Sequence, residues 1–146
     1  MQSRARIFGH PLHLILIVFP LGLLATSFFF DLAWLATGRE QLAIVAWWMI
    51  FAGVAGGLAA SVFGLVDYLA IPRGTKARRI GALHGGGNTI VAALFAASWL
   101  LRRDLPGHPM GVAIALSALG VLLTVFTGWL GSELADRMEE VESEDG

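Results

Sequence analysis

Cysteine is absent from this chain of 146 residues. Its absence excludes disulfide bonds, iron–sulfur clusters held by thiolates, and zinc sites built on cysteine. Any metal would have to be bound by the four histidines, by carboxylates or by methionine sulfur. The chain also lacks an excess of positive charge, because its net charge at pH 7 is −1. We therefore expect no nucleic-acid partner.

Charged residues are scarce as well. They make up 14% of the chain, whereas an average soluble domain contains about 25%. No Asp, Glu, Lys or Arg occurs in four long intervals, which cover residues 7–30, 41–66, 80–101 and 105–132. A helix needs about 20 apolar residues to cross the hydrocarbon core of a bilayer. Each interval meets that length, and 56% of the chain is hydrophobic.

The sequence therefore predicts an all-α, up-down bundle of four membrane-spanning helices, with the lipid bilayer as its main partner. The expected helices cover about residues 11–36, 41–70, 80–101 and 109–134, within one domain over residues 1–137. The remainder, residues 138–146, is rich in Glu and Asp, and its composition predicts a disordered acidic tail. The first apolar run is longer than the roughly 7–15-residue core of a signal peptide, so we expect it to remain as a span.

Basic residues predict the orientation of the bundle. Six of them fall on one side, at the amino terminus and between the second and third helices: Arg4, Arg6, Arg73, Lys76, Arg78 and Arg79. The opposite side has three: Arg39, Arg102 and Arg103. Because basic loops stay in the cytoplasm, both termini are expected to be cytoplasmic in a bacterial inner membrane.

Small residues recur in the second helix at Gly53, Gly57, Ala60 and Gly64. This spacing favours close approach of a neighbouring helix backbone in lipid. A substrate path along the same face is the alternative.

Polar residues collect at the cytoplasmic ends of the predicted helices. His10 and His13 begin the first helix, Asp67 ends the second, and His84 with Asn88 begins the third. Polar groups are costly in lipid and usually face the bundle interior, so these five are the candidate binding residues. The run of three glycines after His84 would leave a surface without side chains, where a flat ligand could lie.

Each candidate also has a structural interpretation. His10 could cap the first helix, His13 and His84 could hydrogen-bond each other or Asp67, and Asn88 could form an interhelical bond. Asp67 could pair with the neighbouring basic loop through Arg78 or Arg79. At the opposite end, Asp31 could pair with Arg102 or Arg103, and His108 is expected to be a turn residue.

Four motifs stand out along the chain. They are Gly9-His10-Pro11-Leu12-His13 with Phe19-Pro20-Leu21-Gly22 and Phe30-Asp31, Gly64 to Pro72, His84 with Asn88, and Gly128-Trp129-Leu130-Gly131. Together they resemble a bacterial membrane protein family known as domain of unknown function 2231. The resemblance covers nearly the whole chain and implies a four-helix inner-membrane protein. Some members of this family are joined to a Rieske-type iron–sulfur domain. The resemblance therefore favours a role in electron transfer. This chain has no cysteine and no such domain, so a redox partner would be a separate protein.

Three functions are compatible with these residues. The first is electron transfer by a haem b held between His13 and His84, with His10 as a substitute for His13 and with Asn88 and Asp67 orienting the ligands. The second is a non-enzymatic membrane subunit or interaction module. The third is a metal-ion binder, with His13 and His84 as the main ligands and His10 and Asp67 as further ones, or a small transporter that uses the same residues. With only four helices, a transporter would have to act as a homo-oligomer. No nucleophile–base pair, phosphate loop or HExxH motif indicates a hydrolytic enzyme.

Overall fold

The computed structural model describes residues 6–7 and 10–144, and the side chains of residues 16–133. Four long helices follow one another: α1 (Leu12–Thr37), α2 (Glu40–Ala70), α3 (Lys76–Leu101) and α4 (Gly111–Glu144). Ahead of α1, two short strands, β1 (Arg6–Ile7) and β2 (His10–Pro11), pair antiparallel. All four helices are long and apolar enough to span a membrane, as the sequence predicts.

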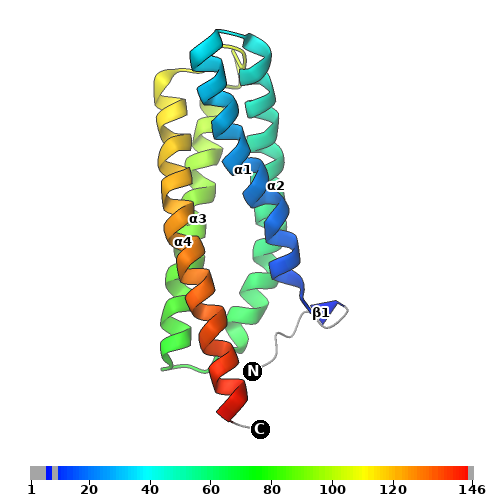
Figure 1. The fold of residues 1–146 in the computed structure, drawn as a ribbon, viewed down its shortest axis with the longest axis vertical. Coiled ribbons are helices and arrows are strands. Elements are labelled where there is room, and N and C mark those ends of the chain that lie inside the picture. Colours follow the sequence, from blue (N-terminus) through cyan, green and yellow to red (C-terminus); the bar gives the residue numbers. More distant parts are fainter. Residues whose placement is uncertain (1–5, 8–9, 145–146) are drawn as a thin grey trace.

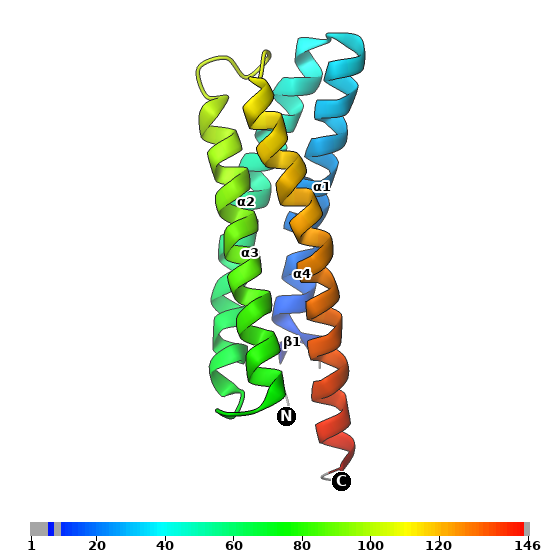
Figure 2. The same ribbon diagram turned by 90° about the vertical axis from the view of Figure 1, so that its left-hand side faces the viewer.

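The bundle consists of two helical hairpins (Figure 1). α1 packs mainly on α2, and α3 packs mainly on α4, with fewer contacts between the two pairs. The α1–α2 and α3–α4 connections lie at one end of the bundle, which we call the Asp31 end. β1, the α2–α3 connection and the end of α4 lie at the other, which we call the His84 end (Figures 1 and 2).

The core of the bundle is narrow. Leu24, Ile50, Val91 and Phe95 form a buried cluster to which each of the first three helices contributes. Many other large apolar side chains point outward, and Val125 is 71% exposed. An apolar exterior around a thin core is what a lipid-solvated bundle requires, since hydrocarbon and not water contacts its surface.

Glycines set the distance between the helices of each hairpin. A Cβ atom at Gly53 of α2 would lie 2.7 Å from the Leu24 side chain of α1, and one at Gly56 would lie 3.5 Å from Pro20. In the other hairpin, a Cβ atom at Gly120 would lie 2.7 Å from the buried Phe95 ring. These glycines therefore make room for side chains of the neighbouring helix, in keeping with the packing interpretation of the α2 glycines.

Two helix boundaries differ from the sequence prediction. α3 begins at Lys76 and not near residue 80, because the Thr75 hydroxyl caps the helix by accepting from the Arg78 backbone N–H at 3.2 Å. α4 continues to Glu144, through the acidic residues for which the composition predicts a disordered tail. Glu is a good helix former, and extending an existing helix requires no new nucleus, so composition alone places the end of α4 too early.

Candidate functional site

His84 and Asn88 form the polar centre at the His84 end. They lie one turn apart on α3, and Asn88 Nδ2 lies 3.0 Å from His84 Nε2. The other ring nitrogen, Nδ1, lies 2.9 Å from the backbone carbonyl oxygen of Thr127 on α4. Both side chains are half-buried. The site thus joins α3 to α4 within one hairpin.

The two contacts fix the tautomer of His84. A carbonyl oxygen can only accept, so Nδ1 must carry a proton and donate it to Thr127. In the neutral imidazole, Nε2 then has a lone pair, which accepts from the Asn88 amide. Each ring nitrogen therefore has one hydrogen-bond partner inside the hairpin.

Two glycines seat the imidazole against α4. A Cβ atom at Gly131 would lie 2.9 Å from His84 Cε1, and one at Gly87 would meet the methyl group of the buried Thr127. Gly85 and Gly86 face away, since a Cβ atom at either would meet nothing within 4 Å. The three consecutive glycines therefore lie on different sides of α3. They do not form the single flat surface beside His84 that the sequence suggested.

The structure locates the backbone of the other predicted site residues, but of their side chains it describes only that of Asp67. His10 lies in β2, before the first helix, and His13 lies in the first turn of α1; their side chains lie outside the described part of the chain. Asp67 is half-buried in the last turn of α2. Among the residues described, no group of three or more His, Asp or Glu lies close enough to hold a metal ion.

A second polar centre occupies the Asp31 end, and it is more deeply buried. Asp31 of α1 and Arg102, the residue after α3, form a bidentate ion pair with N–O distances of 2.6 and 2.8 Å. Both side chains are 0% exposed. Arg102 also donates to the hydroxyls of Ser98 and Ser117 and to the Ala113 carbonyl oxygen of α4. Three helices are thereby joined through one guanidinium group.

The polar groups of this second centre are hydrogen-bonded to one another. The Ser98 hydroxyl donates to the Ala113 carbonyl oxygen at 2.6 Å and lies 2.9 Å from the Ser117 hydroxyl. Buried ions are stable only when paired and hydrogen-bonded, and every group here has a partner. Pairing of Asp31 with Arg102 was one of two alternatives open to the sequence; the structure selects it, because Arg103 is exposed and contacts Asp104 instead. The serines were not predicted, since hydroxyls in apolar helices are common.

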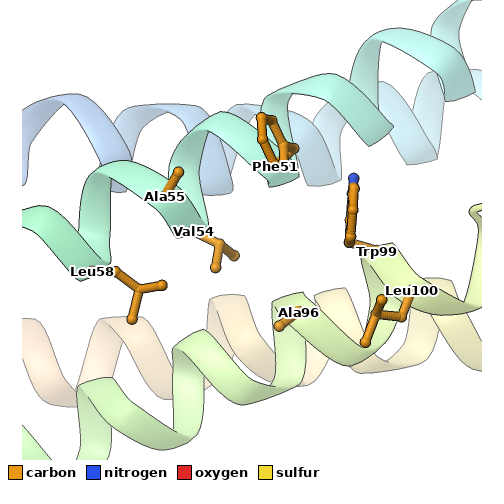
Figure 3. Close-up of a pocket in the computed structure, with 7 residues that line it drawn as sticks. All are labelled: Phe51, Val54, Ala55, Leu58, Ala96, Trp99 and Leu100. Atoms are coloured by element: carbon orange, nitrogen blue, oxygen red, sulfur yellow. The ribbon is translucent and has the colours of Figure 1, made fainter.

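An apolar groove of about 220 Å³ runs between α2 and α3 (Figure 3). Phe51, Val54 and Leu58 line it on one side, with Ala96 and Trp99 on the other. The Trp99 indole N–H is buried without an acceptor in the described part of the chain. This groove contains none of the predicted site residues, and its apolar lining suits a hydrocarbon chain or an apolar side chain.

The basic α2–α3 connection is ordered by one of its own arginines. Arg78 Nη1 donates to the carbonyl oxygens of Tyr68 and Ile71, both at 2.8 Å. Its guanidinium carbon lies 4.1 Å from the centre of the Tyr68 ring. A cation at the carboxyl end of α2 complements the helix dipole and satisfies carbonyl groups that the helix leaves unpaired.

Comparison with protein families matches residues 9–142 to the family described as "Predicted membrane protein (DUF2231)", and the chain belongs to this family. Comparison with curated proteins and with solved structures gives no match.

Proposed function

We propose that this member of the DUF2231 family is a non-enzymatic subunit or interaction module of the bacterial inner membrane. The observation that carries the proposal is the satisfaction of both polar centres by the protein itself. Each ring nitrogen of His84 has a partner on α3 or α4, and every nitrogen of the Arg102 guanidinium donates to Asp31, a serine or a carbonyl group. In this role the polar groups fix the arrangement of the helices, and the exposed apolar faces meet partners.

The state of the protein in its own membrane tests this function. The tagged chain would be extracted with a mild detergent and separated on a native gel, with its mass compared with that of the chain purified alone. A subunit should migrate as a complex of defined, larger mass that disperses in a harsher detergent. Migration as a single chain in both detergents would contradict the proposal.

The orientation belongs to the same proposal, with both termini in the cytoplasm. Support comes from the bias of basic residues toward the amino terminus and the α2–α3 connection. Reporter fusions after residue 38 and after residue 106 should report an outside location, and a fusion at the carboxyl terminus an inside one. An outside-facing carboxyl terminus would overturn the orientation without bearing on the subunit role.

A specific observation favours a second candidate, a haem b-binding electron-transfer protein. Histidines that bind a metal through Nε2 usually donate Nδ1–H to a carbonyl group, and His84 has this arrangement with Thr127. Ligation would require Asn88 to release Nε2, and His13 or His10 would have to supply the second ligand. A separate protein would then act as the redox partner.

A reduced-minus-oxidised spectrum of protein expressed with ample haem separates the two candidates. Haem b ligated by His84 should give a Soret band that His84→Ala abolishes, while Asn88→Ala, which frees Nε2, should retain or strengthen it. A colourless protein that takes up no haem on titration would eliminate this candidate. Elemental analysis of the same sample tests the remaining alternative, a metal-ion binder or transporter that works as an oligomer.

A further inference from the structure

One exposed face of α3 combines positive charge with an apolar track. Lys76, Arg79, Leu83, Gly86 and Ile90, which we call the α3 stripe, follow one another at intervals of three and four residues. Residues at this spacing share one helix face. All five are exposed; Leu83 is 62% exposed and Ile90 is 55% exposed. The first half of α3, which carries the stripe, lies toward the viewer in Figure 2.

The cations at the start of the stripe have no ion-pair partner among residues 16–133. Arg78 between them is bound to carbonyl groups at the end of α2, but neither Lys76 nor Arg79 forms an ion pair or side-chain hydrogen bond in the described part of the chain. The first turn of α3 contains no acidic residue. Two cations at the positive end of a helix dipole disfavour the helix, and an anion beside them would offset that cost.

The rest of the stripe is shaped for a hydrocarbon chain. Gly86 lies between Leu83 and Ile90 and leaves a gap where a chain can approach the helix backbone, since a Cβ atom there would meet nothing within 4 Å. From Arg79 to Ile90 the helix rises about 16 Å at 1.5 Å per residue. One leaflet of a bilayer contributes about half of the roughly 30 Å hydrocarbon core. The distance from the cation Arg79 to the far end of the apolar track therefore matches the depth of one leaflet.

We propose that the α3 stripe binds an anionic phospholipid, with the phosphate between Lys76 and Arg79 and an acyl chain along Leu83, Gly86 and Ile90. The charge of the cations selects an anionic headgroup over a zwitterionic one, and the apolar track selects a lipid over free phosphate. Arg78 and Thr75 hold the adjoining connection in place, so little order has to be gained on binding. The site is independent of whether the protein binds haem or acts as a subunit.

The headgroup contact is tested with the full chain in detergent, titrated with dioleoyl phosphatidylglycerol or dioleoyl phosphatidylcholine and followed by native mass spectrometry. The wild type should prefer phosphatidylglycerol. Lys76→Gln with Arg79→Gln should reduce that preference by about fivefold for each cation, since a basic residue near an anionic surface contributes ~1 kcal/mol. The control, Arg39→Gln with Arg103→Gln, removes the same charge from exposed positions at the Asp31 end. This control should keep the preference for phosphatidylglycerol.

Three results would overturn the headgroup contact. They are an absence of preference in the wild type, an equal loss in both double variants, and displacement of the lipid by a modest excess of inorganic phosphate. The last would show a simple phosphate site without a lipid.

The acyl track has its own matched pair of variants. Gly86→Leu fills the gap in the stripe, whereas Gly85→Leu places the same side chain one residue away, and neither position has a neighbour to clash with. Both changes should favour the helix, so loss of folding does not confound the comparison. Gly86→Leu should weaken phosphatidylglycerol binding several-fold and Gly85→Leu should leave it unchanged. Equal binding by the two variants would refute the acyl track.

Discussion

The two ends of the bundle handle polar groups in opposite ways. At the Asp31 end, an ion pair with 0% exposed side chains joins α1 to the end of α3 and to α4, and so ties the two hairpins together. At the His84 end, the His84 contact joins only α3 to α4, within one hairpin. Within residues 16–133, the basic residues at this end are exposed apart from Arg78. The comparison indicates that stability is concentrated at one end, and that surface open to ligands and partners is concentrated at the other.

The largest expected effect comes from breaking the ion pair at the Asp31 end. Arg102→Ala leaves the Asp31 carboxylate buried without a partner and should lower the free energy of unfolding by about 3–5 kcal/mol. Arg103→Ala, at the next position, removes an exposed side chain with a weak contact to Asp104 and should have little effect. Unfolding in detergent followed by circular dichroism measures both.

A double variant, Asp31→Ala with Arg102→Ala, sharpens this test. Its loss of unfolding free energy should be smaller than the sum of the losses in the two single variants, because no charge is left unpaired. If Arg102→Ala behaved like Arg103→Ala, the Asp31 end would not be the stable end of the molecule.

The next largest effect concerns the packing of α4 against His84. Gly131→Ala would place a Cβ atom 2.9 Å from His84 Cε1 and should cost about 1–3 kcal/mol, because the half-buried ring is held by two hydrogen bonds. Gly128→Ala lies on the same helix, in open space, and should stabilise by about 0.5–1 kcal/mol. Changes of the same sign in both variants would show that α4 does not pack on His84 in this way.

A smaller effect is expected from the Asn88 amide. Asn88→Ala removes the donor to His84 Nε2 and should cost about 1 kcal/mol, the net contribution of a typical hydrogen bond. Thr89→Ala, at the adjacent exposed position, removes only a bond to the Gly85 carbonyl group of its own helix and should be close to neutral. A cost for Asn88→Ala no larger than that for Thr89→Ala would indicate that the His84 end contributes no stability through this contact.

The sequence predicts the helices better than it predicts the sites, for a physical reason. Charge-free intervals as long as residues 105–132 cannot be solvated by water at reasonable cost, so they specify membrane helices directly. The partner of a polar residue depends on rotation about each helix axis, which composition does not specify. Asp31 therefore had two candidate partners, and His84 was expected to meet His13, Asp67 or a ligand. Its observed partner on α4 is a backbone carbonyl group, which every residue carries and no sequence pattern marks.

The smallest expected effect tests whether a second contact reinforces the Asp31 end. His108 Nε2 lies 3.4 Å from a Glu40 carboxylate oxygen and links the α3–α4 connection to the start of α2. Both side chains are 58% exposed, so water screens the pair. Glu40→Gln should therefore lower the free energy of unfolding, measured by circular dichroism in detergent, by less than about 0.5 kcal/mol. A loss comparable to that of Arg102→Ala would mean that the exposed pair, and not the buried one, ties the hairpins together.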